Sequence, residues 1–245
     1  MKKYIACRVR NSIDIIKDFM SHYESFDGFF FYDDQSDDGT REYLESHPKS
    51  VVVNDVEPWK PSSWRDQVAH RSKACKRLLK SSDPEDWMFL LDSDEFISFE
   101  PDVLNENRVV TLNLYDAVIT KDDKDSHFLD RRWFEKSARK ITFAVRCGDF
   151  KEITGHRTIR VKSGSRFSDP CGVVRHFGRA RSLEKFDEKC DYYVKHAGLG
   201  SYKEKWSARK GNGVTEINLK KHFNWDEVYG SNADNVEIRK DEKSS

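Results

Sequence analysis

The feature that most constrains the fold is an alternation of strand-like and helix-like segments over the first hundred residues. Apolar runs with the length and composition of buried strands occupy residues 2–10, 27–33, 50–55 and 86–96. Apolar side chains recur at helical spacing in residues 12–26, 40–46 and 64–80. This alternation predicts an α/β fold, in which a mostly parallel, Rossmann-like sheet with right-handed crossovers is flanked by helices.

The pattern changes after Pro101. Residues 107–119, 138–147 and 156–164 alternate like strands, residues 120–137 form a polar loop between the first two, and residues 181–198 are amphipathic and helical in pattern. We therefore expect residues 1–100 and 101–225 to be two halves of one domain. The last stretch, residues 226–245, has a composition typical of a disordered tail.

Charge divides the chain in the same way. The 43 basic and 43 acidic residues give a net charge of zero, but residues 1–130 carry 17 Lys and Arg against 27 Asp and Glu. Residues 131–221 carry 23 against 10. Acidic residues suit metal coordination and basic residues suit a polyanionic or phosphate-bearing partner, although the two halves could also neutralise each other.

The sequence gives few signs of export or membrane insertion. It shows no stretch of about 18 apolar residues and no signal-peptide pattern at the start. Its five cysteines are odd in number and lack C-x-x-C spacing, which favours reduced thiols over disulfides or a structural zinc site. A cytoplasmic location is the expectation that follows. The cysteines are Cys7, Cys75, Cys147, Cys171 and Cys190.

Two clusters of aspartate follow apolar runs. The first is "DDQSDDGT", residues 33–40, in which Asp38 or Thr40 can cap the next helix. Its spacing also approaches a calcium loop running from Asp34 to Glu45, but an apolar strand precedes it where such a loop needs a helix. A solvated acidic turn is a third interpretation. In an open α/β sheet, ligands bind at the carboxyl ends of the strands, which is where these acids are predicted.

The second cluster is "LLDSDEF", residues 90–96. Asp92 and Asp94 are two residues apart at the end of a strand, so both carboxylates can face one hard cation. We expect the two aspartate-tipped strands to lie side by side and to share one ligand.

These motifs resemble those of the GT-A glycosyltransferases, in particular the family 2-like group and its branch with an extended DSDEF motif. The resemblance rests on "CRVRNSIDII", on "DDQSDDGT", on "LLDSDEF" and on the later "RHFGRARSLEKFDEK", and covers about residues 4–190. Gln35 departs from the pattern, since a glycine is usual there, and no motif identifies a catalytic base.

The resemblance implies a metal-dependent transfer of a sugar from a nucleoside-diphosphate sugar to a hydroxyl acceptor. The cation, Mn²⁺ or Mg²⁺, would be held by Asp92, Asp94 and, by motif match, His176, with His156 as a weaker alternative. The remaining expected donor-binding residues are Arg8, Arg10, Asp33, Asp34, Gln67, Arg71 and Ser93, with Asp92 shared between cation and donor.

The base and the acceptor are less constrained. Glu95, Asp149 and Glu152 are candidates for the base by position only. The basic, aromatic-rich second half suits a saccharide or lipid-linked acceptor or a polyanion, and a hydroxylated base in DNA is an alternative acceptor. A metal-dependent nuclease or nucleotidyltransferase and a calcium-binding module are the alternatives from other classes.

Overall fold

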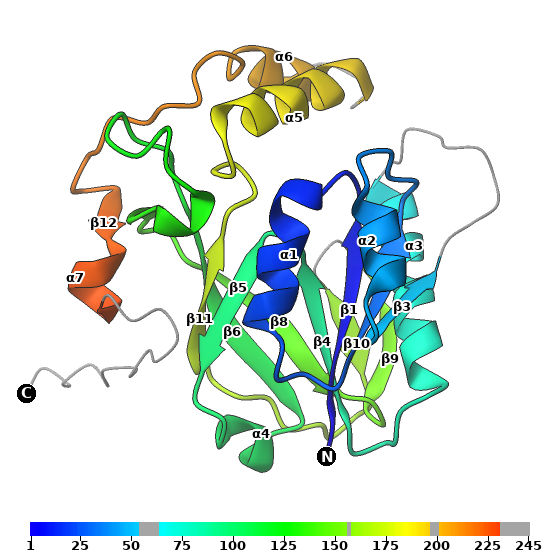
Figure 1. Cartoon of the computed structure of the whole chain (residues 1–245). Helices are drawn as coiled ribbons and strands as arrows, with labels where there is room; N and C mark the ends of the chain where they lie inside the picture. Colours follow the sequence, from blue (N-terminus) through cyan, green and yellow to red (C-terminus); the bar gives the residue numbers. More distant parts are fainter. Residues whose placement is uncertain (54–63, 156–157, 197–200, 231–245) are drawn as a thin grey trace, which may run out of the picture. The chain divides into compact units, whose positions relative to one another are not determined.

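The computed structural model describes residues 1–53, 64–155, 158–196 and 201–230 (Figure 1). The chain divides into two compact units. Unit 1 contains residues 1–96, 101–112 and 140–170, and unit 2 contains residues 97–100, 113–139 and 171–245. The division therefore does not follow residue 100, because residues 101–112 and 140–170 belong with the N-terminal segments.

Unit 1 is built on a sheet whose strands follow the predicted apolar runs. β1 (Lys3–Val9) pairs in parallel with β2 (Gly28–Asp33) on one side and with β4 (Trp87–Asp92) on the other. β3 (Ser50–Val53) extends the parallel part beyond β2, and β8 (Arg139–Arg146) pairs antiparallel to β4. The order β3-β2-β1-β4-β8 confirms an α/β fold with a mostly parallel sheet.

Helices cover both faces of this sheet (Figure 1). α1 (Ile13–His22) packs Phe19 edge-on against Phe31 of β2, at 6.4 Å between ring centroids. α3 (Trp64–Leu79) places Ala74 and Leu78 in a core cluster with Tyr32 on the other face. Because Phe31 and Tyr32 are consecutive strand residues, they point to opposite faces and need one helix each. α2 (Thr40–Ser46) connects β2 to β3.

The sequence predicted a single strand over residues 86–96, but the structure divides this segment into two strands. β4 ends at Asp92, Ser93 and Asp94 form a turn, and β5 (Glu95–Phe99) begins directly afterwards. The rest of unit 1 includes α4 (Val103–Glu106), the first part of β6 (Val109–Asp116), and the antiparallel pair β9 (Phe150–Ile153) and β10 (Ile159–Val161).

In unit 2, the end of β6 pairs in parallel with β11 (Gly172–His176). A second small sheet pairs β7 (Trp133–Glu135) with β12 (His222–Asn224). The helical elements are η1 (Phe128–Asp130), α5 (Leu183–His196), α6 (Ser201–Ser207) and α7 (Trp225–Tyr229). Within the described residues, no helix has the length and apolar composition that crossing a membrane requires.

Two sequence predictions for unit 2 are wrong in part. The polar loop 120–137 contains η1 and β7, and β7 pairs along its length with β12, almost ninety residues later. The predicted tail begins with an ordered helix, α7, whose N-terminus is capped by Asn224 accepting from the Asp226 amide at 3.0 Å. Residues 231–245 lie outside the described residues.

Candidate functional site

The two aspartate-bearing turns lie at the carboxyl edge of the unit 1 sheet. Val9 of β1 is in register with Asp33 of β2, and Arg8 of β1 is in register with Asp92 of β4. From the sequence we expected the two aspartate-tipped strands to be adjacent. In the structure they lie on either side of β1 instead. Neighbouring strands are about 4.8 Å apart, so the two tips are separated by roughly 10 Å.

Asp34 is held by basic groups from three directions. The Arg8 guanidinium contacts Asp34 Oδ2, Arg10 Nη1 donates to the Asp34 carbonyl at 3.0 Å, and His70 Nδ1 lies 3.6 Å from Oδ1. The His70 ring also stacks on Tyr32 of β2, with 4.2 Å between centroids. His70 is not among the residues predicted from the sequence, and only its place beside Arg71 on a helix that packs against β2 could have indicated it.

Asp33 serves a different purpose. Its side chain is fully buried and accepts hydrogen bonds from the amide and hydroxyl of Ser36. Burial raises the pKa of Asp33, and the hydrogen bonds from Ser36 only partly oppose the rise. Asp33 therefore shapes the turn that presents Asp34.

The rest of the acidic turn joins two helix N-termini. Asp38 accepts from the Ile13 amide of α1 at 3.1 Å and from the Thr40 amide of α2 at 3.0 Å, and Thr40 Oγ1 accepts from the Ser12 amide at 2.8 Å. Burial alone would raise the pKa of Asp38, but the hydrogen bonds from Thr40 and Ile13 outweigh it and the pKa is lowered.

A calcium loop of the EF-hand type does not fit this arrangement. The segment that precedes Asp34 is a strand rather than a helix. Asp38, which such a loop would use as a ligand, is instead bound to the two helix N-termini.

The second turn is closed by its own glutamate. Glu95 Oε2 accepts from the Asp92 amide at 2.9 Å, and the Glu95 carbonyl accepts from the Tyr23 hydroxyl at 2.8 Å. The Glu95 side chain is fully buried, whereas Asp92 is partly exposed and contacts the Arg71 guanidinium. The geometry thus gives Glu95, a predicted candidate base, a positioning role in the turn.

The donor atoms at this turn suit a hard cation that keeps other ligands. Asp92 and Asp94 present carboxylate oxygens, and Mg²⁺-like ions are often held by one or two carboxylates together with substrate phosphates. Within the described part of the chain, no group of three or more His, Cys, Asp or Glu side chains is arranged to hold a metal ion. Asp92 also contacts the Arg71 guanidinium, and the binding of a metal ion by Asp92 and Asp94 stays a prediction.

The other donor-site candidates are near this edge. Ser93 is buried and its hydroxyl lies 3.3 Å from that of Ser12. Gln67 is half-buried on α3, one turn before Arg71. The roles of both residues in donor binding stay predictions.

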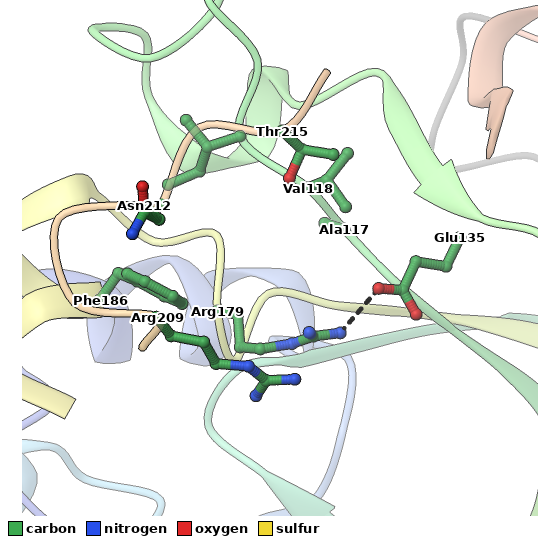
Figure 2. Close-up of a pocket in the computed structure, with 10 residues that line it drawn as sticks. Ala117, Val118, Glu135, Arg179, Phe186, Arg209, Asn212 and Thr215 are labelled. Atoms are coloured by element: carbon green, nitrogen blue, oxygen red, sulfur yellow. Dashed lines mark hydrogen bonds and ion pairs between the residues drawn. The ribbon is translucent and has the colours of Figure 1, made fainter. Parts of the chain in front are cut away.

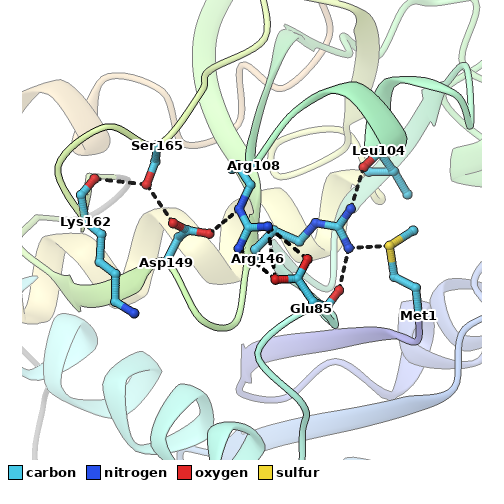
Figure 3. Close-up of polar contacts among 8 residues, drawn as sticks. All are labelled: Met1, Glu85, Leu104, Arg108, Arg146, Asp149, Lys162 and Ser165. Atoms are coloured by element: carbon cyan, nitrogen blue, oxygen red, sulfur yellow. Dashed lines mark hydrogen bonds and ion pairs between the residues drawn. The ribbon is translucent and has the colours of Figure 1, made fainter.

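Asp149 is at the opposite end of the sheet. Gly148 donates to the Pro84 carbonyl at 2.8 Å, just before the start of β4, and Asp149 accepts from Arg108 and Ser165 at 2.6 and 2.9 Å (Figure 3). The six residues of β4 span about 20 Å, so Asp149 does not join the acids at the carboxyl edge. Nothing in this position favours Asp149 as the base, and that role stays a prediction.

Glu152 is also occupied elsewhere. It lies on β9 opposite Arg160 and forms an exposed ion pair with it at 2.6 Å. No geometry here favours it as the base.

His176 belongs to unit 2, at the end of β11. Its Nδ1 contacts Asp116 Oδ1, and Arg139 Nη2 contacts both Asp116, at 2.8 Å, and His176, at 3.3 Å. Burial would raise the pKa of Asp116, but the hydrogen bond from His176 and the nearby arginines lower it overall. The role of His176 as a metal ligand stays a prediction, and His156 lies outside the described residues.

No family model and no curated protein matches the chain. Among solved structures it is similar to TarS from S. aureus, with 13% identity over 86% of this chain and a TM-score of 0.39. It is also similar to HddC from Yersinia pseudotuberculosis, with 9% identity over 79% of this chain and 100% of HddC and a TM-score of 0.39. A third is a 4-diphosphocytidyl-2C-methyl-D-erythritol synthase, with 11% identity over 60% of this chain and 76% of that one and a TM-score of 0.36.

The chain spans 43% of the length of the TarS chain. At TM-scores and identities of this size, no activity follows from the likeness.

Proposed function

We propose that the protein is a metal-dependent glycosyltransferase whose unit 1 binds a nucleoside-diphosphate sugar at the carboxyl edge of its sheet. One observation carries the proposal: the turns after β2 and β4, each with its aspartates, flank the tip of β1 and its Arg8. Carboxylates at two separated points of one edge suit a long polar ligand that has a nucleoside at one end and a diphosphate at the other.

The nucleoside end is assigned to the turn after β2. Asp34 is fixed by Arg8 and lies beside the stacked pair of Tyr32 and His70, so its carboxylate can accept from base or ribose donors. Arg10 and Gln67 are the further donor-binding residues that we propose at this end.

The diphosphate end is assigned to the turn after β4. Asp92 and Asp94 would hold Mn²⁺ or Mg²⁺, and Arg71 and Ser93 would orient the diphosphate. When bound, the ion neutralises the charge that the diphosphate gains as the glycosidic bond breaks. Glu95 fixes the turn through the Asp92 amide, so that both carboxylates keep their spacing.

The test is the release of nucleoside diphosphate from a panel of nucleotide sugars with Mn²⁺, with and without candidate acceptors. We expect Asp94→Asn to lose about a hundredfold or more in rate, because a carboxylate that holds the charge-neutralising ion is removed. Asp37→Asn is the matched control, since Asp37 is an exposed acid in the neighbouring turn.

Three results would count against the proposal. Equal rates for the two variants would remove the metal assignment. Release of pyrophosphate from a nucleoside triphosphate and a sugar phosphate, with no release from nucleotide sugars, would favour nucleotidyl transfer instead. A panel in which no nucleotide sugar raises the melting temperature with Mn²⁺ would remove the donor, because a ligand well above its Kd should stabilise the protein by a few kcal/mol.

The acceptor is proposed to be a saccharide or lipid-linked hydroxyl. Turnover on oligonucleotides with a hydroxylated base, falling steeply with salt, would assign the acceptor to DNA instead.

A further inference from the structure

Unit 2 contains a pocket that the proposed donor site does not use. Its volume is about 110 Å³, and residues from β7, from α5 and from the segments after β6, β11 and α6 line it (Figure 2). We call it the unit 2 pocket. The side chains that bear on its chemistry are Val118, Glu135, Arg179, Phe186, Arg209 and Thr215.

Two guanidinium groups line this pocket, and they differ in how far nearby carboxylates neutralise their charge. Arg179 Nη2 contacts Glu135 Oε1 at 3.0 Å and Asp116 Oδ2 at 3.7 Å. Within the described residues, no carboxylate lies within ion-pair distance of Arg209. Glu135 is the acid of the lining, so the two arginines leave the unit 2 pocket with a net positive charge.

Arg209 is also held in place by neighbours that are not charged. Its guanidinium lies 5.0 Å above the Trp206 ring, and that ring stacks on Tyr193 with 4.6 Å between centroids. Stacking fixes the plane of the guanidinium while its N–H groups remain able to donate at the edge. Figure 2 shows the side chains of Arg179 and Arg209 extending in the same direction.

The opposite wall is rigid for a steric reason. A Cβ on Gly213 would lie 2.8 Å from Leu183 Cδ2 and 3.1 Å from Phe186 Cδ1, so any larger residue there would have to displace these side chains of α5. The Thr215 amide then donates to the Ile119 carbonyl at 2.7 Å. The wall from Gly213 to Thr215 is thus held between α5 and the segment that follows β6.

We propose that the unit 2 pocket binds a phosphate group. One water occupies about 30 Å³ of liquid, so a volume of about 110 Å³ corresponds to between three and four waters, which leaves room for a group as small as a phosphate. A phosphate group has three or four acceptor oxygens arranged tetrahedrally and up to two negative charges, so it can accept from two guanidinium groups that approach from different segments. The phosphate can be a free ion or the monoester of a larger molecule. The proposal does not depend on the activity assigned to unit 1.

The test measures binding of inorganic phosphate, glycerol 1-phosphate and acetate to the full chain by calorimetry, without any nucleotide sugar. We expect phosphate binding to weaken about tenfold or more in Arg209→Gln and to recover partly in Arg209→Lys, which keeps the charge but loses the fork. Arg132→Gln is the matched control, because Arg132 is a highly exposed arginine of the same unit that does not line the pocket. Tighter binding of glycerol 1-phosphate than of inorganic phosphate would identify a monoester, and the reverse a free ion.

Three results would overturn the proposal. Equal weakening in Arg209→Gln and Arg132→Gln would mean that phosphate responds to diffuse charge and not to this pocket. Acetate binding as tightly as phosphate would exclude the phosphate assignment. The third result is wild-type protein that binds no phosphate although its circular dichroism spectrum shows that it is folded, which would rule out the site.

Discussion

Replacing Asp38 tests how the turn that carries Asp34 is held in place. Oδ1 of Asp38 accepts from the amide and hydroxyl of Thr40, and its Oδ2 accepts from the Ile13 amide. One carboxylate therefore holds the first turns of α1 and α2 beside the turn that carries Asp34. Replacing it should loosen both helix starts.

The magnitude follows from the bonds that each substitution removes. Asp38→Asn can keep the Oδ1 contacts but places an amide N–H₂ toward the Ile13 amide, so we expect a loss of about 1–2 kcal/mol in the free energy of unfolding. Asp38→Ala removes all three bonds and should cost about 2–4 kcal/mol. Asp37→Asn is the control for the change in charge, because Asp37 is exposed, and we expect less than about 0.5 kcal/mol.

The pH dependence provides a second readout. The pKa of Asp38 is lowered in the folded state from 3.8, so its charge stabilises the fold above that value and the contribution is lost as pH falls toward the folded pKa. The difference between wild type and Asp38→Asn should therefore shrink below about pH 4 and be constant at higher pH. Urea unfolding at a series of pH values measures it.

Two outcomes would refute this reasoning. One is a loss for Asp38→Ala no larger than that for Asp37→Asn. The other is a difference between wild type and Asp38→Asn that stays constant as the pH falls below 4.

Three further predictions concern single positions. Gln35 has a φ of 54°, a left-handed conformation that favours glycine, so Gln35→Gly should leave stability unchanged or higher, whereas Gln35→Val should cost about 1–3 kcal/mol in urea unfolding. Arg71→Gln leaves the Asp92 carboxylate without its guanidinium and should lower the unfolding free energy by about 2–4 kcal/mol, while the stabilisation by Mn²⁺ in a thermal-shift assay increases. Native protein should expose to Ellman's reagent one reactive thiol, Cys171, because the other four cysteines are buried and burial raises their pKa, to about 12 for Cys75.

The parts of the fold that the sequence predicted correctly are those set by local hydrophobic patterns. Residues 28–33, GFFFYD, are buried at every position, which matches a parallel strand covered by helices on both faces. α5 likewise follows its amphipathic pattern, from Leu183 to His196. In both segments the burial that stabilises the element is already visible in the order of its own residues.

The sequence predictions fail where contacts between segments far apart in the chain determine the structure. β7 has three residues and pairs with β12, so no local pattern separates it from the polar loop around it. β4 ends at Asp92, whose amide donates to the Glu95 carboxylate, a contact that hydrophobic spacing does not encode. Asp149 was a candidate base only by its place in the sequence, and its Arg108 contact at the far end of the sheet could not be seen there.

The same long-range contacts change how the acidic motifs should be understood. A run of aspartates suggests an uncompensated negative surface that only a cation could neutralise. In the structure, Asp34 contacts Arg8, Asp92 contacts Arg71 and Asp38 contacts two backbone amides. The proposed nucleotide and cation would therefore compete with Arg8 for Asp34 and with Arg71 for Asp92. Such competition favours a ligand that brings anionic groups of its own, because the displaced guanidinium can then pair with a phosphate and its charge is not left uncompensated.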